Sequence, residues 1–142
     1  MKIKMNNASL LDAFKTINKF SECTGKLAYA LSKTRRKMAA EVKDFEDTRD
    51  GLIRKYGTED ENGNIRIEPD TEGYTKFINE IIPISQDIVE VDIYQISREE
   101  FEDADYYCEE ATMRDYEMLE ALFVKAEEKD EPEEKENDDG DE

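Results

Sequence analysis

The sequence predicts an α+β protein that is mostly helical, in which a long helical hairpin lies beside a small three-stranded sheet. Apolar residues recur at helical spacing over most of the 142 residues. Three short segments, residues 1–5, 64–68 and 89–96, have the alternating or β-branched pattern of strands. Charged residues make up 41% of the chain and hydrophobic residues 37%, so a core depends on this regular spacing.

The first strand and the first helix are predicted before Gly25. MKIKM alternates polar and apolar side chains, as does a short strand with one buried face. Three polar residues after it can cap a helix: Asn6, Asn7 and Ser9. The apolar residues from Leu10 to Phe20 then fall at helical spacing, and Gly25 breaks this helix.

A second, longer helix is predicted from about residue 26 to residue 56. One row of apolar residues recurs at every seventh position: Leu31, Met38, Phe45 and Leu52. The companion row, three residues earlier, contains Arg35 and Arg49. We expect this seam to face another helix, with a carboxylate opposite each arginine, and Gly57 to end the helix.

Two further strands and a third helix are predicted in the middle of the chain. Asn62 and Gly63 form a strong tight-turn signal before the strand at 64–68. A helix starts near Thr71 and is ended or kinked by Pro83. The β-branched run IVEVDIYQI then forms the clearest strand of the chain.

The predicted organisation is an α+β core, residues 1–105, on which a C-terminal acidic helix, residues 106–126, is packed. Ser97 and Glu100 have the spacing of a capping box, which starts a short helical segment within the core. Eleven of the 16 residues from 127 to 142 are acidic and none is a large apolar residue. This tail is therefore expected to be disordered.

The charge of the chain is concentrated at its C-terminal end. Residues 1–60 hold 13 Lys and Arg against 9 Asp and Glu, whereas residues 98–142 hold 5 against 21. The net charge of −18 argues against a protein that binds nucleic acid directly or binds an anionic membrane. We expect the partner to be a protein with a basic surface.

The cysteines and the start of the chain predict a cytoplasmic protein. Cys23 and Cys108 lie far apart in the sequence and are expected to be reduced structural thiols. The first residues lack a continuous apolar segment, and no stretch approaches the ~18 apolar residues of a membrane span.

No motif predicts catalysis, a cofactor or a metal site. The chain has no histidine, which excludes the common zinc sites and His-dependent nucleophiles. The loop around Gly63 resembles a calcium loop, but Thr58 and Pro69 stand where calcium needs carboxylates. The sequence therefore predicts that the protein is not an enzyme and holds no cofactor.

The C-terminal helical pattern mixes aromatic and acidic residues. Carboxylates three to four residues apart on a helix can imitate the charge spacing of a nucleic-acid backbone, and tyrosine adds contact area typical of binding hot spots. The candidate partner-binding residues are Tyr106, Tyr107, Glu109, Glu110, Asp115, Tyr116, Glu117 and Glu120. The alternative is an amphipathic helix whose acidic face is only solvated.

The long helix carries a basic cluster, Lys33, Arg35, Arg36 and Lys37. These side chains spread around most of a helical turn, so they cannot form a flat phosphate-binding track. A solvated face is the first interpretation. The alternative is that they bind an acidic surface, including the tail of a neighbouring copy.

The segments LIRKYGTEDENGNIRI (52–67) and VEVDIYQIS (89–97) resemble small proteins encoded by phages and prophages of Gram-positive bacteria. The resemblance covers about residues 1–102, and the function of that family is uncharacterised. It implies a phage setting and supplies no catalytic or binding residues. Residues 103–142 depart from the family pattern.

In a phage setting, a small acidic protein is expected to inhibit a host defence system, as an anti-CRISPR protein does. Its acidic helix would occupy a basic nucleic-acid-binding surface of a host protein, such as a nuclease effector, by charge mimicry. The alternative is a structural adaptor or assembly chaperone that holds a partner with the helical hairpin. The sequence does not decide whether the protein forms a homodimer, because the seam arginines allow self-association and the net charge opposes it.

Overall fold

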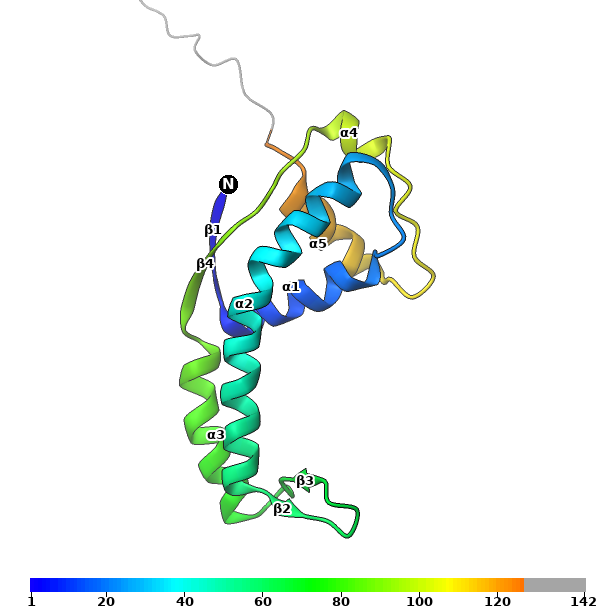
Figure 1. Cartoon of the computed structure of the whole chain (residues 1–142). Helices are drawn as coiled ribbons and strands as arrows, with labels where there is room; N and C mark the ends of the chain where they lie inside the picture. Colours follow the sequence, from blue (N-terminus) through cyan, green and yellow to red (C-terminus); the bar gives the residue numbers. More distant parts are fainter. Residues whose placement is uncertain (127–142) are drawn as a thin grey trace, which may run out of the picture.

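The computed structural model describes residues 1–126, which form a head and an arm (Figure 1). We call residues 1–45 and 86–126 the head, and residues 46–85 the arm. The fold is α+β and mostly helical, as predicted. The tail that is predicted to be disordered, residues 127–142, lies outside the described residues.

The head begins with a strand that leads directly into a helix. β1 (Lys2–Asn6) is followed by α1 (Asn7–Lys19) without a connecting loop. The side-chain oxygen of Asn6 accepts a hydrogen bond of 2.8 Å from the backbone N–H of Ser9, which caps the helix as predicted.

The 32-residue helix α2 (Gly25–Tyr56) runs through both the head and the arm (Figure 1). Its buried side chains all lie in its first two thirds: Leu27, Ala30, Leu31, Thr34, Met38, Val42 and Phe45. The predicted apolar row of α2 is therefore buried in the head, but Leu52, its last member, is only half-buried in the arm.

The prediction that a carboxylate faces each seam arginine is wrong. Arg35 is exposed, and its side chain donates a hydrogen bond to the Asn18 side chain of α1. Arg49 pairs with Glu46 and Asp50 of its own helix. Val42, which lies between the two arginines in the same row, is buried, so the departure concerns the arginine positions and not the whole row.

Two separate two-stranded sheets replace the predicted three-stranded sheet. β4 (Ile88–Asp92) pairs antiparallel with β1 in the head. β2 (Thr58–Glu59) and β3 (Ile65–Arg66) pair with each other at the far end of the arm (Figure 1). Gly63, with a φ of 84°, allows the tight turn that brings β3 back beside β2. The length of α2 keeps β3 away from the strands of the head.

The remaining helices are α3 (Glu72–Ser85), α4 (Arg98–Glu102) and α5 (Met113–Phe123). α3 packs beside the second half of α2 and continues two residues past Pro83. The last helix is shorter than the predicted 106–126, because a capping box of Thr112 and Asp115 starts it at Met113.

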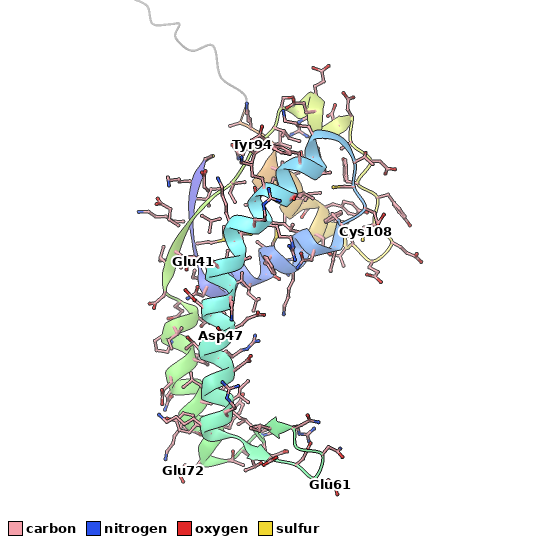
Figure 2. The ribbon with its side chains drawn as sticks, in the orientation of Figure 1. Glu41, Asp47, Glu61, Glu72, Tyr94 and Cys108 are labelled. Carbon is pink, nitrogen blue, oxygen red and sulfur yellow. The ribbon has the colours of Figure 1, made fainter. Side chains whose placement is uncertain are left out.

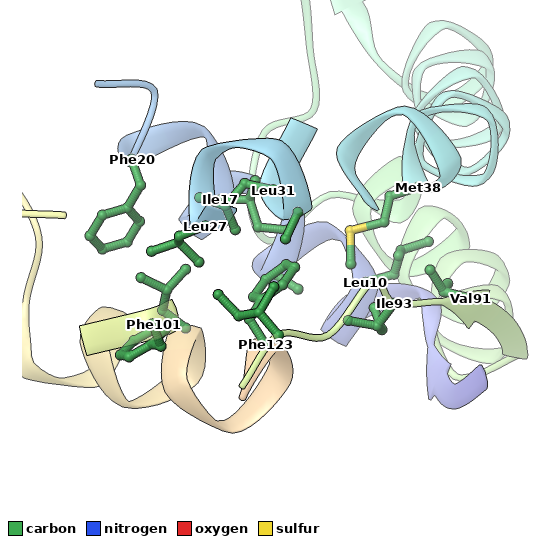
Figure 3. Packing of buried hydrophobic residues seen from close by; sticks show 14 of the residues in the cluster. Leu10, Ile17, Phe20, Leu27, Leu31, Met38, Val91, Ile93, Phe101 and Phe123 are labelled. Carbon is green, nitrogen blue, oxygen red and sulfur yellow. The ribbon is translucent and has the colours of Figure 1, made fainter. Parts of the chain in front are cut away.

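One apolar core fills the head (Figure 3). Every major element of the head contributes to it, with the large side chains Leu10, Met38, Ile93, Phe101 and Phe123 among its members. Because α5 supplies Phe123 and Leu119, the C-terminal helix is part of this core. None of the helices in residues 1–126 has the length together with the apolar composition that a membrane crossing needs.

Candidate partner-binding surface

The exposed negative charge of the head is concentrated in residues 99–110, which we call the acidic segment. It contains seven Asp and Glu and no Lys or Arg. It starts in α4 and continues through the loop that leads toward α5 (Figure 1). Most of its carboxylates are exposed, whereas Glu100 lies 3.7 Å from the Lys26 ammonium group and closes the capping box of α4.

The non-helical part of the acidic segment is fixed to the rest of the head by backbone hydrogen bonds. The Thr24 N–H donates to the carbonyl oxygen of Asp105 at 3.1 Å, and the Asp105 N–H donates to the Thr24 hydroxyl at 2.9 Å. Further along, the Tyr116 hydroxyl accepts from the Cys108 N–H at 2.9 Å and donates to the Cys108 carbonyl at 3.1 Å. The loop is thus held at two points.

Two of the predicted binding tyrosines form part of the internal packing. Tyr106 packs against the buried Phe101 with ring centroids 4.7 Å apart and the rings tilted by 39°, and its ring also approaches Tyr116. Tyr116 meets Phe20 edge to face. Both tyrosines are half-buried, so they position the acidic segment and offer little area to a partner.

Tyr107, Glu109 and Glu110 lie where a partner can reach them. The Tyr107 residue is 76% exposed, and both glutamates are exposed on the loop beside Cys108, which is labelled in Figure 2. Neither glutamate forms an ion pair within residues 1–126. Together with Glu117 of α5, these three residues are the part of the predicted site that is exposed and forms no ion pair within residues 1–126.

The prediction that Asp115 binds a partner is wrong. Asp115 is only 7% exposed, and its carboxylate lies 2.7 Å from the Lys19 ammonium group and accepts from the Thr16 hydroxyl at 3.2 Å. The hydrogen bond from Lys19, followed by that from the Thr112 backbone N–H, lowers the pKa of Asp115 to about 2. Asp115 is an internal anchor that joins α5 to α1.

The two glutamates predicted on the last helix have different surroundings. Glu120 pairs with Arg98 at 2.7 Å, so its charge is partly satisfied. Glu117 is exposed and forms no ion pair within the described residues. Because Asp115 is internal, α5 does not present the continuous acidic face that the sequence predicts.

Four exposed carboxylates of the acidic segment lie outside the predicted set of binding residues. Glu99, Glu102, Asp103 and Asp105 are exposed in the acidic segment. The charge count of residues 98–142 includes these four carboxylates. The helical pattern of residues 106–126, however, favoured residues further along the chain. The candidate surface therefore lies earlier in the sequence than predicted.

The described residues offer no arrangement suited to metal binding. Within residues 1–126 no three acidic or cysteine side chains cluster closely enough to hold a metal ion.

Burial raises the pKa of the half-buried Cys23 thiol, which favours its unreactive protonated form.

Comparison with models of known protein families, with curated proteins and with solved structures finds no match.

Proposed function

We propose that the protein is a binding protein that presents its acidic segment to a basic surface of a host protein. The observation that carries this proposal is a run of seven carboxylates, without a basic residue, on a backbone held by Thr24 and Tyr116. A loop that is already ordered loses less conformational entropy on binding. Its charge steers a basic partner toward it.

The partner class we propose is a host protein that itself binds nucleic acid, such as an RNA-guided nuclease. A channel built for phosphates has a row of basic side chains, and the exposed carboxylates of residues 99–110 would take the places of the phosphates. Tyr107 would add an aromatic contact beside them. The sequence resemblance to phage proteins supports a role as a defence inhibitor in the cytoplasm of an infected cell.

The first experiment neutralises the segment without changing its shape. In the segment variant, Glu102→Gln, Asp103→Asn, Glu109→Gln and Glu110→Gln are combined. The tagged wild-type protein is used to recover partners from a lysate of a phage-sensitive Gram-positive bacterium, and the affinity for the recovered protein is then measured. We expect the segment variant to bind at least about tenfold more weakly, because four charge contacts are lost.

A matched variant controls for the change in net charge. Asp44→Asn, Glu61→Gln, Asp87→Asn and Glu90→Gln remove the same four charges from exposed positions outside the acidic segment. This variant should bind like the wild type. Equal affinities of the two variants would show that the position of the removed charges does not matter, and the proposal would fail.

A second candidate function is an assembly adaptor that uses the arm, and one specific observation favours it. Tyr74, Ile78 and Ile82 are four residues apart along one side of α3, and Tyr74 and Ile82 are 39% and 44% exposed. Apolar residues exposed on a paired helix are typical of a helix-binding surface. Loss of partner capture in Tyr74→Ser with Ile82→Asn, but not in the segment variant, would select this function.

A further inference from the structure

A second charged surface of the head is positive. It is a hollow of about 650 Å³ between the first half of α2, the chain that follows β4, and residues 125–126. We call it the basic hollow. Three lysines line it, Lys33, Lys37 and Lys125, whereas Asp92 is the one carboxylate among its lining residues.

The positive charge of the basic hollow is only partly balanced within residues 1–126. Asp92 lies 3.2 Å from the Lys37 ammonium group and 3.0 Å from the amine of Met1, so one carboxylate is shared by two cations. The amine and Lys37 together lower the pKa of Asp92. Lys33 and Lys125 form no ion pair in the described part of the chain.

Aromatic rings hold Lys33 in place without supplying a countercharge. Its ammonium group lies 5.7 Å from the ring centroid of Tyr29 and 5.8 Å from that of Tyr94. Tyr94 is itself fixed, because its backbone N–H donates to the buried Thr34 hydroxyl at 2.9 Å. Lys26 lies on the same Tyr94 ring, at 5.9 Å. Within the described residues, the hollow is therefore a cationic surface whose ammonium groups outnumber its one carboxylate.

We infer that the basic hollow binds an acidic peptide segment, and that its occupant is residues 127–142 of the same chain. Eleven of these 16 residues are acidic and two are basic, which complements the three lysines. The described chain ends at Ala126, which itself lines the hollow. The segment is therefore attached at the edge of its binding surface.

Covalent attachment to the edge of the hollow favours residues 127–142 over other acidic peptides as the occupant. A short tether gives an effective concentration of the order of millimolar, so even weak charge contacts are populated within one chain. A neighbouring copy or a partner would have to displace the attached segment first. This inference goes beyond the proposed function, since it concerns a different face of the head and does not require a basic partner.

The decisive experiment joins lysines to contacting carboxylates with a zero-length carbodiimide. The full-length protein is treated as an equal mixture of ¹⁴N- and ¹⁵N-labelled chains, and the linked peptides are identified by mass spectrometry. We expect residues 127–142 to be linked to Lys33 and Lys37 within one chain at least about fivefold more often than to Lys15 and Lys76. These two control lysines are exposed and lie outside the hollow.

Two outcomes would overturn the inference. Links spread evenly over the lysines would show that the segment has no preferred binding surface. Links that join ¹⁴N to ¹⁵N chains would show that the occupant comes from a neighbouring copy.

A pair of variants tests the same inference by NMR. Lys33→Gln with Lys37→Gln should move the amide signals of residues 127–142 to the positions they take in 0.5 M salt, because the attraction is lost in both cases. Lys15→Gln with Lys76→Gln, which removes the same charge elsewhere, should leave them in place. Tail signals that are identical in both variants and the wild type would refute the inference, and unchanged head signals verify the fold.

Discussion

The head and the arm contain parts of the same helix, α2, but hold it in different ways. In the head, α2 is packed into a core to which α1, β4, α4 and α5 contribute. In the arm it meets α3 and, at its last turn, β3, and Ile81 is the one residue of residues 46–85 that is buried. A continuous helix therefore does not imply uniform stability along its length.

What stabilises the arm is mostly local. The ion pairs that involve it are short-range: Lys43 with Asp47, Arg49 with Glu46, and Lys76 with Glu72. Such exposed helix pairs contribute little to stability, because water and salt screen them. The joint to the head depends on Asn7, whose side-chain amide donates to the Ile84 carbonyl at 2.9 Å. We therefore expect the arm to open locally before the head unfolds.

The largest expected difference comes from the same truncation in both regions. Phe123→Ala removes a fully buried ring from the core of the head and should lower the free energy of unfolding by about 3–5 kcal/mol. Phe77→Ala removes a half-buried ring from the arm and should cost about 1–2 kcal/mol. Urea denaturation followed by circular dichroism measures both, and equal losses would show that the arm is packed as tightly as the head.

A smaller effect is expected from the internal anchor of α5. Asp115→Ala should lower the free energy of unfolding by about 2 kcal/mol at pH 6, because the variant loses hydrogen bonds from Lys19, Thr16 and Thr112. Asp115→Asn keeps the side-chain oxygen near Thr112 and loses the charge, so it should cost about half as much. Denaturation curves at fixed salt compare the two variants.

The same anchor predicts a pH dependence with a definite sign. The pKa of Asp115 in the folded state, about 2, lies below its ordinary value of 3.8, so the folded state favours the ionised form. Its contribution to stability is therefore present above about pH 4 and is lost as the pH falls toward 2. The stability difference between wild type and Asp115→Asn should shrink over this range, and a constant difference would contradict the role of the charge.

The smallest effects come from two glycines of the arm and should have opposite signs. Gly51 lies inside α2 with open space around it, so Gly51→Ala should stabilise the arm by about 0.5–1 kcal/mol. Gly57 has backbone oxygens of Ile53 and Arg66 within 2.8 Å of an added Cβ, so Gly57→Ala should destabilise the arm.

Hydrogen exchange of backbone amides can localise both glycine effects. Exchange of the arm amides should slow in Gly51→Ala and accelerate in Gly57→Ala, with little change at amides of α1 and α5. If both variants changed exchange equally in the head and the arm, the arm would not open as a separate unit.

The regular elements of the fold were predictable because their signals are local. Apolar spacing located α1, α2 and α3, and the capping residues Asn6 and Ser97 marked two helix starts. Strand pairing was not predictable in the same way. The partner of β3 depends on how far α2 carries the chain from the head, and no short sequence window contains that distance.

The location of the negative charge could be predicted from the sequence, but the contacts of the individual carboxylates could not. Charge counts placed the acidic surface in the C-terminal third of the chain, and Tyr107, Glu109 and Glu110 are exposed there. The internal role of Asp115 depends on Lys19, which is 96 residues away in the sequence. A pattern read along one helix could not reveal that contact.

The unbroken path of α2 also makes it a spacer of defined length. At about 1.5 Å per residue, its 32 residues separate the two ends of the molecule by about 48 Å. The acidic segment lies near one end and the β2–β3 hairpin lies at the other (Figure 1). Two macromolecules could therefore be held at the same time without touching each other, at a separation set by the helix.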